Sequence, residues 1–472
     1  MQNLRKTHDL LLQTYRKVKS GKVSKDALIA HALDSGFIDR VDDIFLNAIS
    51  NNSESLPEWD WKPHWGMIET LLREADQTDV FNYSPGLVFP FADTLFEGLH
   101  VQTVTKILDG THNTPTIAPY VRQILEIGAL SITSPFTGDE IKSRKGLFFY
   151  FGGKPYIIYV FFDIEPILIF ANPNLGDLLA CYFPARRMLI GKRFSYARVI
   201  VKLKALCVRY ASDLCRYFAD ERSEPVLTSS FMQHTGHTLL NEISGFDTAI
   251  LEIENFNKRI MLLGPHEYLD FARLFPEFDR SRMLKVDLGK KSEFLLCLEN
   301  SYLPVRPTLQ HYLIKETLRN RLREFLNCNS KISFGAMTSN VVWIEVRSNH
   351  RVWLNQVDAI RIIITKLIDH YPNVSVFIAG WSLPADPSEE DNVQIRFDMK
   401  IYKEVAEFAA GRLPVICGVG LSSEEKLRWA FRCSASVVTF GSGMTLPCLC
   451  PALSQIYLRS FTRTRIMQDG RL

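Results

Sequence analysis

Two arginines, Arg347 and Arg351, follow a short β-branched run, and their type and spacing suit the binding of an anion. Residues 340–346 predict a strand, and the amphipathic pattern of 356–370 predicts a helix. A guanidinium fork matches phosphate oxygens with two hydrogen bonds, and the N-terminus of a following helix adds a positive dipole end. The segment therefore predicts a phosphate clamp. The alternative is a pair of surface arginines in ordinary salt bridges.

A glycine-rich turn, Gly441-Ser442-Gly443, follows a second predicted strand at 436–440. Glycines at a strand-to-helix turn let backbone N–H groups approach a phosphate closely. No Gly-Lys-Ser/Thr follows, so the turn is not a Walker loop, and Leu446 stands where a dinucleotide fingerprint has its third glycine. It also lacks the spacing of a nucleophile elbow. A phosphate cradle and a purely structural tight turn both remain open.

Two histidines, His234 and His237, follow a predicted strand at 226–230. Their spacing could serve a metal, but no further ligand stands at a fitting distance, so no metal site is predicted. A histidine at a strand end suits a general base near neutral pH, which makes His237 the candidate catalytic residue. Asn241 and Glu242 follow within two helical turns and could orient His237 or contact a hydroxylated acceptor. A capping or core histidine is the structural alternative.

The elements around these residues alternate regularly in the last third of the chain. Strands are predicted at 340–346, 374–379, 414–417, 436–440 and 455–458, and helices at 356–370, 400–411 and 423–433. Such alternation predicts a parallel, doubly wound sheet, whose carboxyl edge carries the loops that follow the strands. These loops are 347–351, 380–382, 418–421 and 441–445.

Four regions are predicted along the chain. Residues 1–130 form a helical N-terminal region with a break at Ser35-Gly36, and 131–195 form a β-rich region of antiparallel hairpins. Residues 196–330 form a first Rossmann-like domain, with strands at 249–254 and 259–264, and 331–472 form a second. The predicted fold class is α/β, with two Rossmann-like domains facing a ligand cleft, a helical appendage and a β-rich insertion.

Composition excludes several classes of protein. The 472 residues, with 46% hydrophobic and 23% charged, describe a globular protein of roughly two to four domains. A net charge of +3 lacks the electrostatic footprint of a nucleic-acid binder. Nine scattered cysteines without a CxxC pair argue against a disulfide framework or zinc ribbon and favour a reducing compartment.

No targeting or membrane-spanning segment is expected. The N-terminus is a polar, charged helical pattern without the apolar core of a signal peptide. The most apolar run, 155–170, is broken by Asp163, Glu165 and Pro166, which predicts a pair of buried strands. We therefore expect a cytoplasmic protein without a transmembrane segment, and peripheral membrane association stays open.

The segment Arg347-Ser348-Asn349-His350-Arg351, followed by Asn355, resembles the R-S-x-x-R-x-x-x-N-E-x-E signature of glycosyltransferase family 61. These are capsular-polysaccharide-type transferases with two Rossmann-like domains, the GT-B fold. Residues 234–242 look like that family's Gly-His-Phe-type segment, so the resemblance spans roughly 225–460. Two positions depart from it. Gln356 replaces an acidic residue, and Phe440-Gly441-Ser442-Gly443 stands where relatives have a His-Gly-Ala-type loop.

The resemblance implies a transferase that moves a sugar from a nucleotide-diphosphate donor to a saccharide or lipid-linked saccharide acceptor in surface-polysaccharide synthesis. Its 196–330 domain would hold the acceptor, with His237 as base and Asn241 and Glu242 beside it. Its 331–472 domain would hold the nucleotide sugar, which is a substrate and not a cofactor. The donor-binding residues would be Arg347, Arg351, Asn355, Gly441, Ser442 and Gly443.

Other readings of the same pattern stay open. No Asp-x-Asp stands at a strand end, so metal-independent transfer is expected, and no nucleic-acid partner is. The absent loop histidine favours a non-catalytic binding or scaffold protein on a degenerate transferase fold, whose helical N-terminus would recruit a partner. Another nucleotide-sugar enzyme, such as an epimerase, is a third reading.

Overall fold

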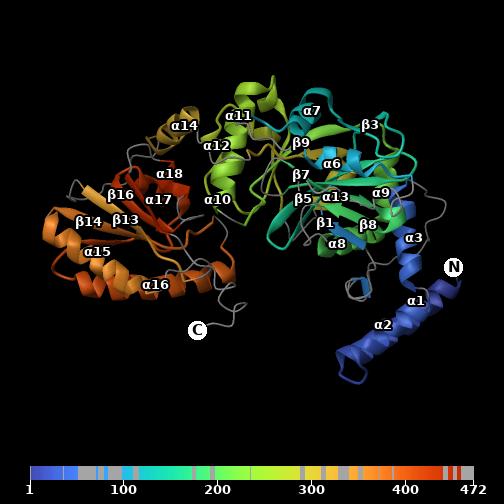
Figure 1. Cartoon of the computed structure of the whole chain (residues 1–472), viewed down its shortest axis with the longest axis horizontal. Helices are drawn as coiled ribbons and strands as arrows, with labels where there is room; N and C mark the ends of the chain where they lie inside the picture. The colour runs from blue at the N-terminus through green and yellow to red at the C-terminus, as the bar shows by residue number, and fades with distance from the viewer. Residues whose placement is uncertain are drawn as a thin grey trace. The chain divides into compact units, whose positions relative to one another are not determined.

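The computed structural model describes residues 2–35, 37–50, 71–72, 79–82, 98–109, 116–172, 177–191, 197–233, 235–287, 293–309, 315–327, 340–348, 355–371, 373–384, 387–439, 445–449 and 454–458 (Figure 1). By internal contacts the chain divides into two compact units. Unit 1 comprises Met1–Thr228, Arg259–Met261 and Val286–Gln310, and unit 2 comprises Ser229–Lys258, Leu262–Lys285 and His311–Leu472. The four regions predicted from sequence are not tested by this division and stay a prediction.

Unit 1 begins with helices α1 (Gln2–Lys19), α2 (Lys25–Asp34) and α3 (Phe37–Ile49). The Ser24 hydroxyl accepts the Ala27 N–H and caps α2, and Ser35 ends it, which confirms the predicted break. α3 is not an appendage, because Phe45 and Ile49 are buried and the helix packs against α8 (Ala197–Arg209) and α9 (Ala211–Ala219).

A six-stranded sheet organises unit 1, in the order β1-β8-β7-β6-β5-β4. Neighbours from β4 to β8 are antiparallel, and β1 joins the edge parallel to β8. The predicted hairpins are thus confirmed. The strands are β1 (Asp79–Asn82), β4 (Gly146–Phe151), β5 (Lys154–Phe161), β6 (Ile167–Ala171), β7 (Leu178–Phe183) and β8 (Met188–Gly191), with the 3₁₀ turn η3 (Pro184–Arg186) between the last two.

Smaller elements complete unit 1. A separate hairpin pairs β2 (Leu130–Thr133) with β3 (Glu140–Ser143), beside helices α6 (Val101–Asp109) and α7 (Pro119–Ile127). The apolar run at 155–170 is confirmed as buried strands, since β6 is buried along its whole length. Within the described residues, no helix has the length and apolarity needed to cross a membrane.

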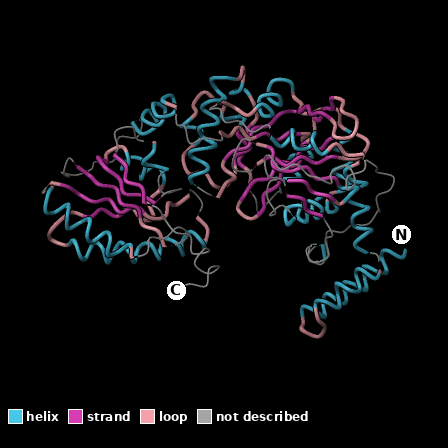
Figure 2. The backbone as a smooth tube through the Cα atoms, in the orientation of Figure 1, coloured by secondary structure: helices cyan, strands magenta, loops and turns pink. Residues whose placement is uncertain are grey.

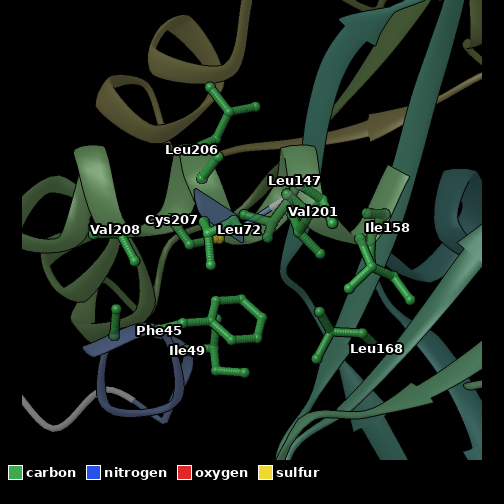
Figure 3. Packing of buried hydrophobic residues seen from close by; sticks show 14 of the residues in the cluster. Phe45, Ile49, Leu72, Leu147, Ile158, Leu168, Val201, Leu206, Cys207 and Val208 are labelled. Atoms are coloured by element: carbon green, nitrogen blue, oxygen red, sulfur yellow. The ribbon is translucent and has the colours of Figure 1, made fainter. Parts of the chain in front are cut away.

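The main core of unit 1 lies between its sheet and its helices. Phe45 and Ile49 of α3 extend toward Leu168 of β6, with Cys207 of α8 beside them (Figure 3). Helix α13 (Glu293–Glu299) adds Phe294 to the same cluster. Each fully buried large apolar side chain contributes about 1.5–3 kcal/mol, so this cluster dominates the stability of unit 1.

A four-stranded sheet has the order β11-β10-β9-β12, with β12 parallel to β9. Its strands are β9 (Glu224–Ser229), β10 (Met261–Leu263), β11 (Met283–Lys285) and β12 (Tyr302–Val305). After β9 come α10 (Thr235–His237), the π-helical turn η5 (Thr238–Ile243) and α11 (Ser244–Glu252). The strand predicted at 249–254 is wrong. Its residues 249–252 end a helix, and a short apolar run cannot by itself distinguish the two.

The remaining elements after α11 are short. They are the 3₁₀ turns η6 (Phe256–Lys258) and η7 (Arg280–Arg282), and helices α12 (Phe271–Leu274) and α14 (Glu316–Asn327). Arg321 of α14 forms an ion pair with the buried Asp247 of α11, its Nε lying 3.0 Å from Oδ1. This contact fixes α14 against α11.

The C-terminal sheet is entirely parallel, in the order β15-β14-β13-β16-β17. The strands are β13 (Asn340–Glu345), β14 (Val374–Ala379), β15 (Val415–Cys417), β16 (Cys433–Thr439) and β17 (Ser454–Leu458). The helices are α15 (Gln356–His370), α16 (Glu389–Ala409), α17 (Ser423–Ala430) and α18 (Thr445–Cys448). The predicted α/β class is confirmed as a mixed α/β fold with parallel sheets.

Helices lie on both faces of this sheet (Figures 1 and 2). α15 and α16 cover the face that carries Ile344 and Ile378, whereas Trp429 of α17 stacks on Phe377 of the opposite face. α16 starts eleven residues before the predicted position, at a capping box formed by Ser388 and Asp391. A similar box at Ser422 confirms the predicted start of α17.

The strand order of the C-terminal sheet fixes where a ligand is expected. Counted along the chain the order is 3-2-1-4-5, so the connections reverse direction between β13 and β16. Ligands of open α/β sheets bind outside the carboxyl ends of the strands at such a switch point. The residues that follow β13 and β16 are therefore the first candidates for a binding site.

Candidate functional site

Arg347 stands two residues beyond the end of β13, at this switch point. Its Nε lies 2.9 Å from Oε1 of Glu345, the last residue of the strand. The Glu345 side chain is only 8% exposed and that of Arg347 20%, so the ion pair lies largely below the surface. The contact anchors the guanidinium group at the carboxyl end of the central strand.

Gln356, the first residue of α15, holds the backbone of Arg347 from the other side. The Arg347 N–H donates to Oε1 of Gln356 at 3.2 Å, and Nε2 of Gln356 donates to the Arg347 carbonyl at 2.9 Å. A carboxylate cannot donate the second bond. Gln356, where the family signature has an acidic residue, therefore makes a pair of hydrogen bonds to Arg347. A glutamate could keep only one of them.

Gln356→Glu is expected to lower the free energy of unfolding by about 1–3 kcal/mol, because it leaves the partly buried Arg347 carbonyl without this donor. Urea denaturation followed by circular dichroism measures the change. Asp358→Asn is the control, since the Asp358 side chain in the same helical turn is 71% exposed. Equal stability of Gln356→Glu and wild type would contradict this pair of hydrogen bonds.

A buried carboxylate, Asp398 of α16, joins the loops that follow β13 and β14. Its Oδ1 accepts the Ser348 N–H at 3.1 Å and the Ser348 hydroxyl at 2.5 Å. Its Oδ2 accepts the Trp381 N–H at 2.8 Å. Gln394 donates to both Ser348 and Asp398. Asp398 is 1% exposed, so its charge is compensated by these donors.

A buried lysine, Lys426 of α17, lies in the same region. Its ammonium group donates to the Gly380 carbonyl at 2.5 Å and to the Ser382 hydroxyl at 3.0 Å. Burial lowers the pKa of Lys426 to about 7, against the opposing effect of the Asp398 and Glu345 carboxylates. Neither Lys426 nor Asp398 was predicted from sequence. The only sequence signal for either residue was a charge at a core-facing position, on α16 for Asp398 and on α17 for Lys426.

Lys426→Met is expected to flatten the pH dependence of stability between pH 7 and 9. The unfolded chain keeps a proton on Lys426 up to its ordinary pKa of 10.5, whereas the folded chain loses it near 7. Raising the pH therefore stabilises the folded wild type, by about 2 kcal/mol from pH 7 to 9 relative to the variant.

Denaturant titrations of both proteins at pH 7, 8 and 9 measure this difference, and the comparison cancels groups that the two chains share. Parallel stability curves would contradict a lowered pKa of Lys426. The expected outcome is a free energy of unfolding of the wild type that rises relative to that of Lys426→Met as the pH is raised from 7 to 9.

His237, the last residue of α10, lies close to Asn241 of the following π-helical turn. Nδ1 of His237 lies 3.0 Å from Oδ1 of Asn241. That oxygen can only accept, so Nδ1 carries the proton and Nε2 is the basic nitrogen of the neutral ring. Single π-helical turns often occur at functional sites. The catalytic role of His237 stays a prediction.

Glu242 holds a strained turn at the end of β9. Its Oε1 accepts the Ser229 hydroxyl at 2.5 Å and the Ser230 N–H at 2.6 Å. Ser230 has a φ of 62°, a left-handed conformation that costs a non-glycine residue energy. Asn241 and Glu242 are both 0% exposed. Their geometry supports positioning of His237 and of this turn, and their predicted contact with the acceptor stays a prediction.

The other predicted site residues have little structural description. Asn355 precedes α15 with a φ of 59°, which asparagine tolerates better than most residues, and its side chain makes no capping bond. His234, Arg351 and the Gly441-Ser442-Gly443 turn lie outside the described residues. Their proposed roles rest on sequence alone.

Comparison with known proteins leaves the family open. No protein-family model and no curated protein matches the chain. Among solved structures, E. coli heptosyltransferase WaaC with ADP aligns at 12% identity and a TM-score of 0.24, covering 52% of this chain and 96% of that one. TarM aligns at 12% identity and a TM-score of 0.16, covering 71% and 62%. Similarities this low carry no argument, so function has to be argued from the residues.

Proposed function

We propose that this protein is a glycosyltransferase that moves a sugar from a nucleotide-diphosphate donor to a saccharide or glycoconjugate acceptor. The observation that carries the proposal is Arg347, anchored at the carboxyl end of the central strand where the C-terminal sheet reverses its connections. A cation at this position suits a diphosphate. The resemblance to glycosyltransferase family 61 at residues 347–355 makes that diphosphate part of a sugar nucleotide.

The donor site would be built around the residues that follow β13 and β16. Arg347 and Arg351 would neutralise the charge that builds on the diphosphate as it leaves, and the Gly441–Gly443 turn would supply backbone N–H groups. Asn355 would act beside them at the start of α15. The two guanidinium groups would offset the diphosphate charge, and this set of residues contains no carboxylate that could bind a metal ion. The transfer would therefore proceed without a metal ion.

The acceptor would be activated by His237. As the acceptor oxygen bonds to the anomeric carbon, its proton passes to Nε2 of His237. The bond from the anomeric carbon to the diphosphate breaks, and the diphosphate leaves with the electron pair. Asn241 keeps the proton on Nδ1 and so keeps Nε2 ready to accept one. The two Rossmann-like domains would face each other in a GT-B arrangement.

The first test is titration of the wild-type protein with ADP, GDP, UDP and CDP by calorimetry. At least one is expected to bind, and Arg347→Ala is expected to weaken that binding by about 1.5–3 kcal/mol through loss of a charge-assisted contact. The double variant Arg347→Ala/Glu345→Gln is measured as well, because Arg347→Ala alone would take the ion-pair partner away from the buried Glu345 carboxylate.

Arg396→Ala is the matched control, because Arg396 of α16 forms an exposed ion pair with Glu389 in the same domain. Its affinity should equal that of the wild type. If the wild type binds none of the four nucleotides, the transferase proposal fails and a non-catalytic binding protein becomes the better reading. Unchanged affinity in Arg347→Ala would move the phosphate site elsewhere.

His237→Ala is expected to abolish sugar transfer and to leave nucleoside diphosphate affinity unchanged, because the base acts on the acceptor. A screen of nucleotide sugars, measured as donor hydrolysis or transfer, first identifies a working donor. His370→Ala, at the exposed end of α15, serves as the control. Full turnover in His237→Ala would exclude this residue as the base.

A further inference from the structure

The loops after β13 and β14 are fastened to a single carboxylate. Asp398 accepts two hydrogen bonds from Ser348, which follows β13, and one from the backbone of Trp381, which follows β14. Asp398 thus holds the third residue after β13 and the second residue after β14. Two neighbouring loops at the carboxyl edge of the sheet are held at a fixed separation by one side chain.

The close approach of α16 to this edge depends on Gly380. A Cβ at Gly380 would lie 3.0 Å from both Cβ and Oδ2 of Asp398, and 2.9 Å from Cγ2 of Val419. A side chain there would force Val419 or Asp398 to move. The glycine therefore makes room for the contact that joins the two loops.

Other buried groups hold the residues that directly follow β14. Lys426 binds the Gly380 carbonyl and the Ser382 hydroxyl from α17, the opposite face of the sheet. The indole N–H of Trp381 donates to Oδ1 of Asp391 at 2.8 Å, one helical turn before Gln394. Contacts from both faces of the sheet thus hold Gly380, Trp381 and Ser382 in place. A rigid edge of this kind reduces the ordering entropy that a bound ligand has to offset.

We propose that Asp398 is the positioning residue of the donor site, which holds Ser348 and Trp381 so that the residues directly after β13 and β14 form one preorganised surface for a nucleoside diphosphate. This inference rests on the proposed function. Arg347 precedes Ser348 directly, so the bonds of Ser348 to Asp398 also fix the backbone from which the guanidinium group extends. Together with Gln356, which binds the Arg347 peptide, Asp398 determines where that cation stands.

Asp398→Asn tests the proposal with little change of shape. An amide has one accepting oxygen, so its NH₂ group must face an N–H donor of either Ser348 or Trp381, and one loop is released. We expect the affinity for the tightest-binding nucleoside diphosphate to fall at least about tenfold, which is the factor set by loss of one charge-assisted bond. KM for the donor should rise similarly, with kcat within about threefold of wild type, because binding is lost while His237 is unchanged.

Two further variants make the result decisive. Val405→Ala removes two methyl groups from the buried side of the same helix, about two turns beyond Asp398, and its affinity should stay within about twofold of wild type. Ser348→Ala removes one hydroxyl bond to Asp398 and is expected to weaken binding about threefold, which keeps the test available if Asp398→Asn does not fold.

The outcomes separate this inference from the proposed function. Wild-type affinity in both Asp398→Asn and Ser348→Ala would overturn the positioning role and leave the transferase proposal standing. Equal losses in Asp398→Asn and Val405→Ala would also overturn it, because they would reflect general destabilisation of α16. A wild type that binds none of ADP, GDP, UDP and CDP would overturn both.

Discussion

The C-terminal sheet depends on buried charge being compensated at its carboxyl edge. Glu345, Asp398 and Lys426 are each less than a tenth exposed, and an isolated charge at such depth costs several kcal/mol. Each is therefore bound to a cation, an N–H group or a carbonyl of the loops that leave β13 and β14. The same contacts that compensate these charges therefore also hold the residues directly after β13 and β14 in place.

This constraint separates two roles within the edge. The backbone N–H groups of Arg347 and Ser348 are already bound to Gln356 and Asp398, so they serve the fold. Anion binding after β13 then depends on side chains, above all on that of Arg347, whose backbone is held by Gln356. A similar division is present after β9, where buried Glu242 holds a strained turn and buried Asn241 orients His237. In both places the groups proposed for chemistry are held by buried polar neighbours.

Much of the fold could be predicted because its signals are local. Alternating apolar residues and turn chemistry located β13, β14 and α15 to within a residue, since periodicity and capping act over a few positions. The failures were local as well. Residues 249–252 end a helix, although their short apolar run also fits a strand. Helix α3 is a core element because it packs against α8 and α9, and its own residues do not identify those partners.

The sequence by itself determined the parallel α/β character of the C-terminal third, the position of Arg347 just after a strand, and the four-residue spacing of His237 and Asn241. These follow from residue type and separation along the chain. Only the tertiary structure decided that Gln356 clamps the Arg347 peptide, and that Asp398 joins Ser348 to Trp381. Asp398 lies 50 residues from Ser348 and 17 from Trp381. Such contacts depend on how strands order themselves in the sheet, which no local pattern records.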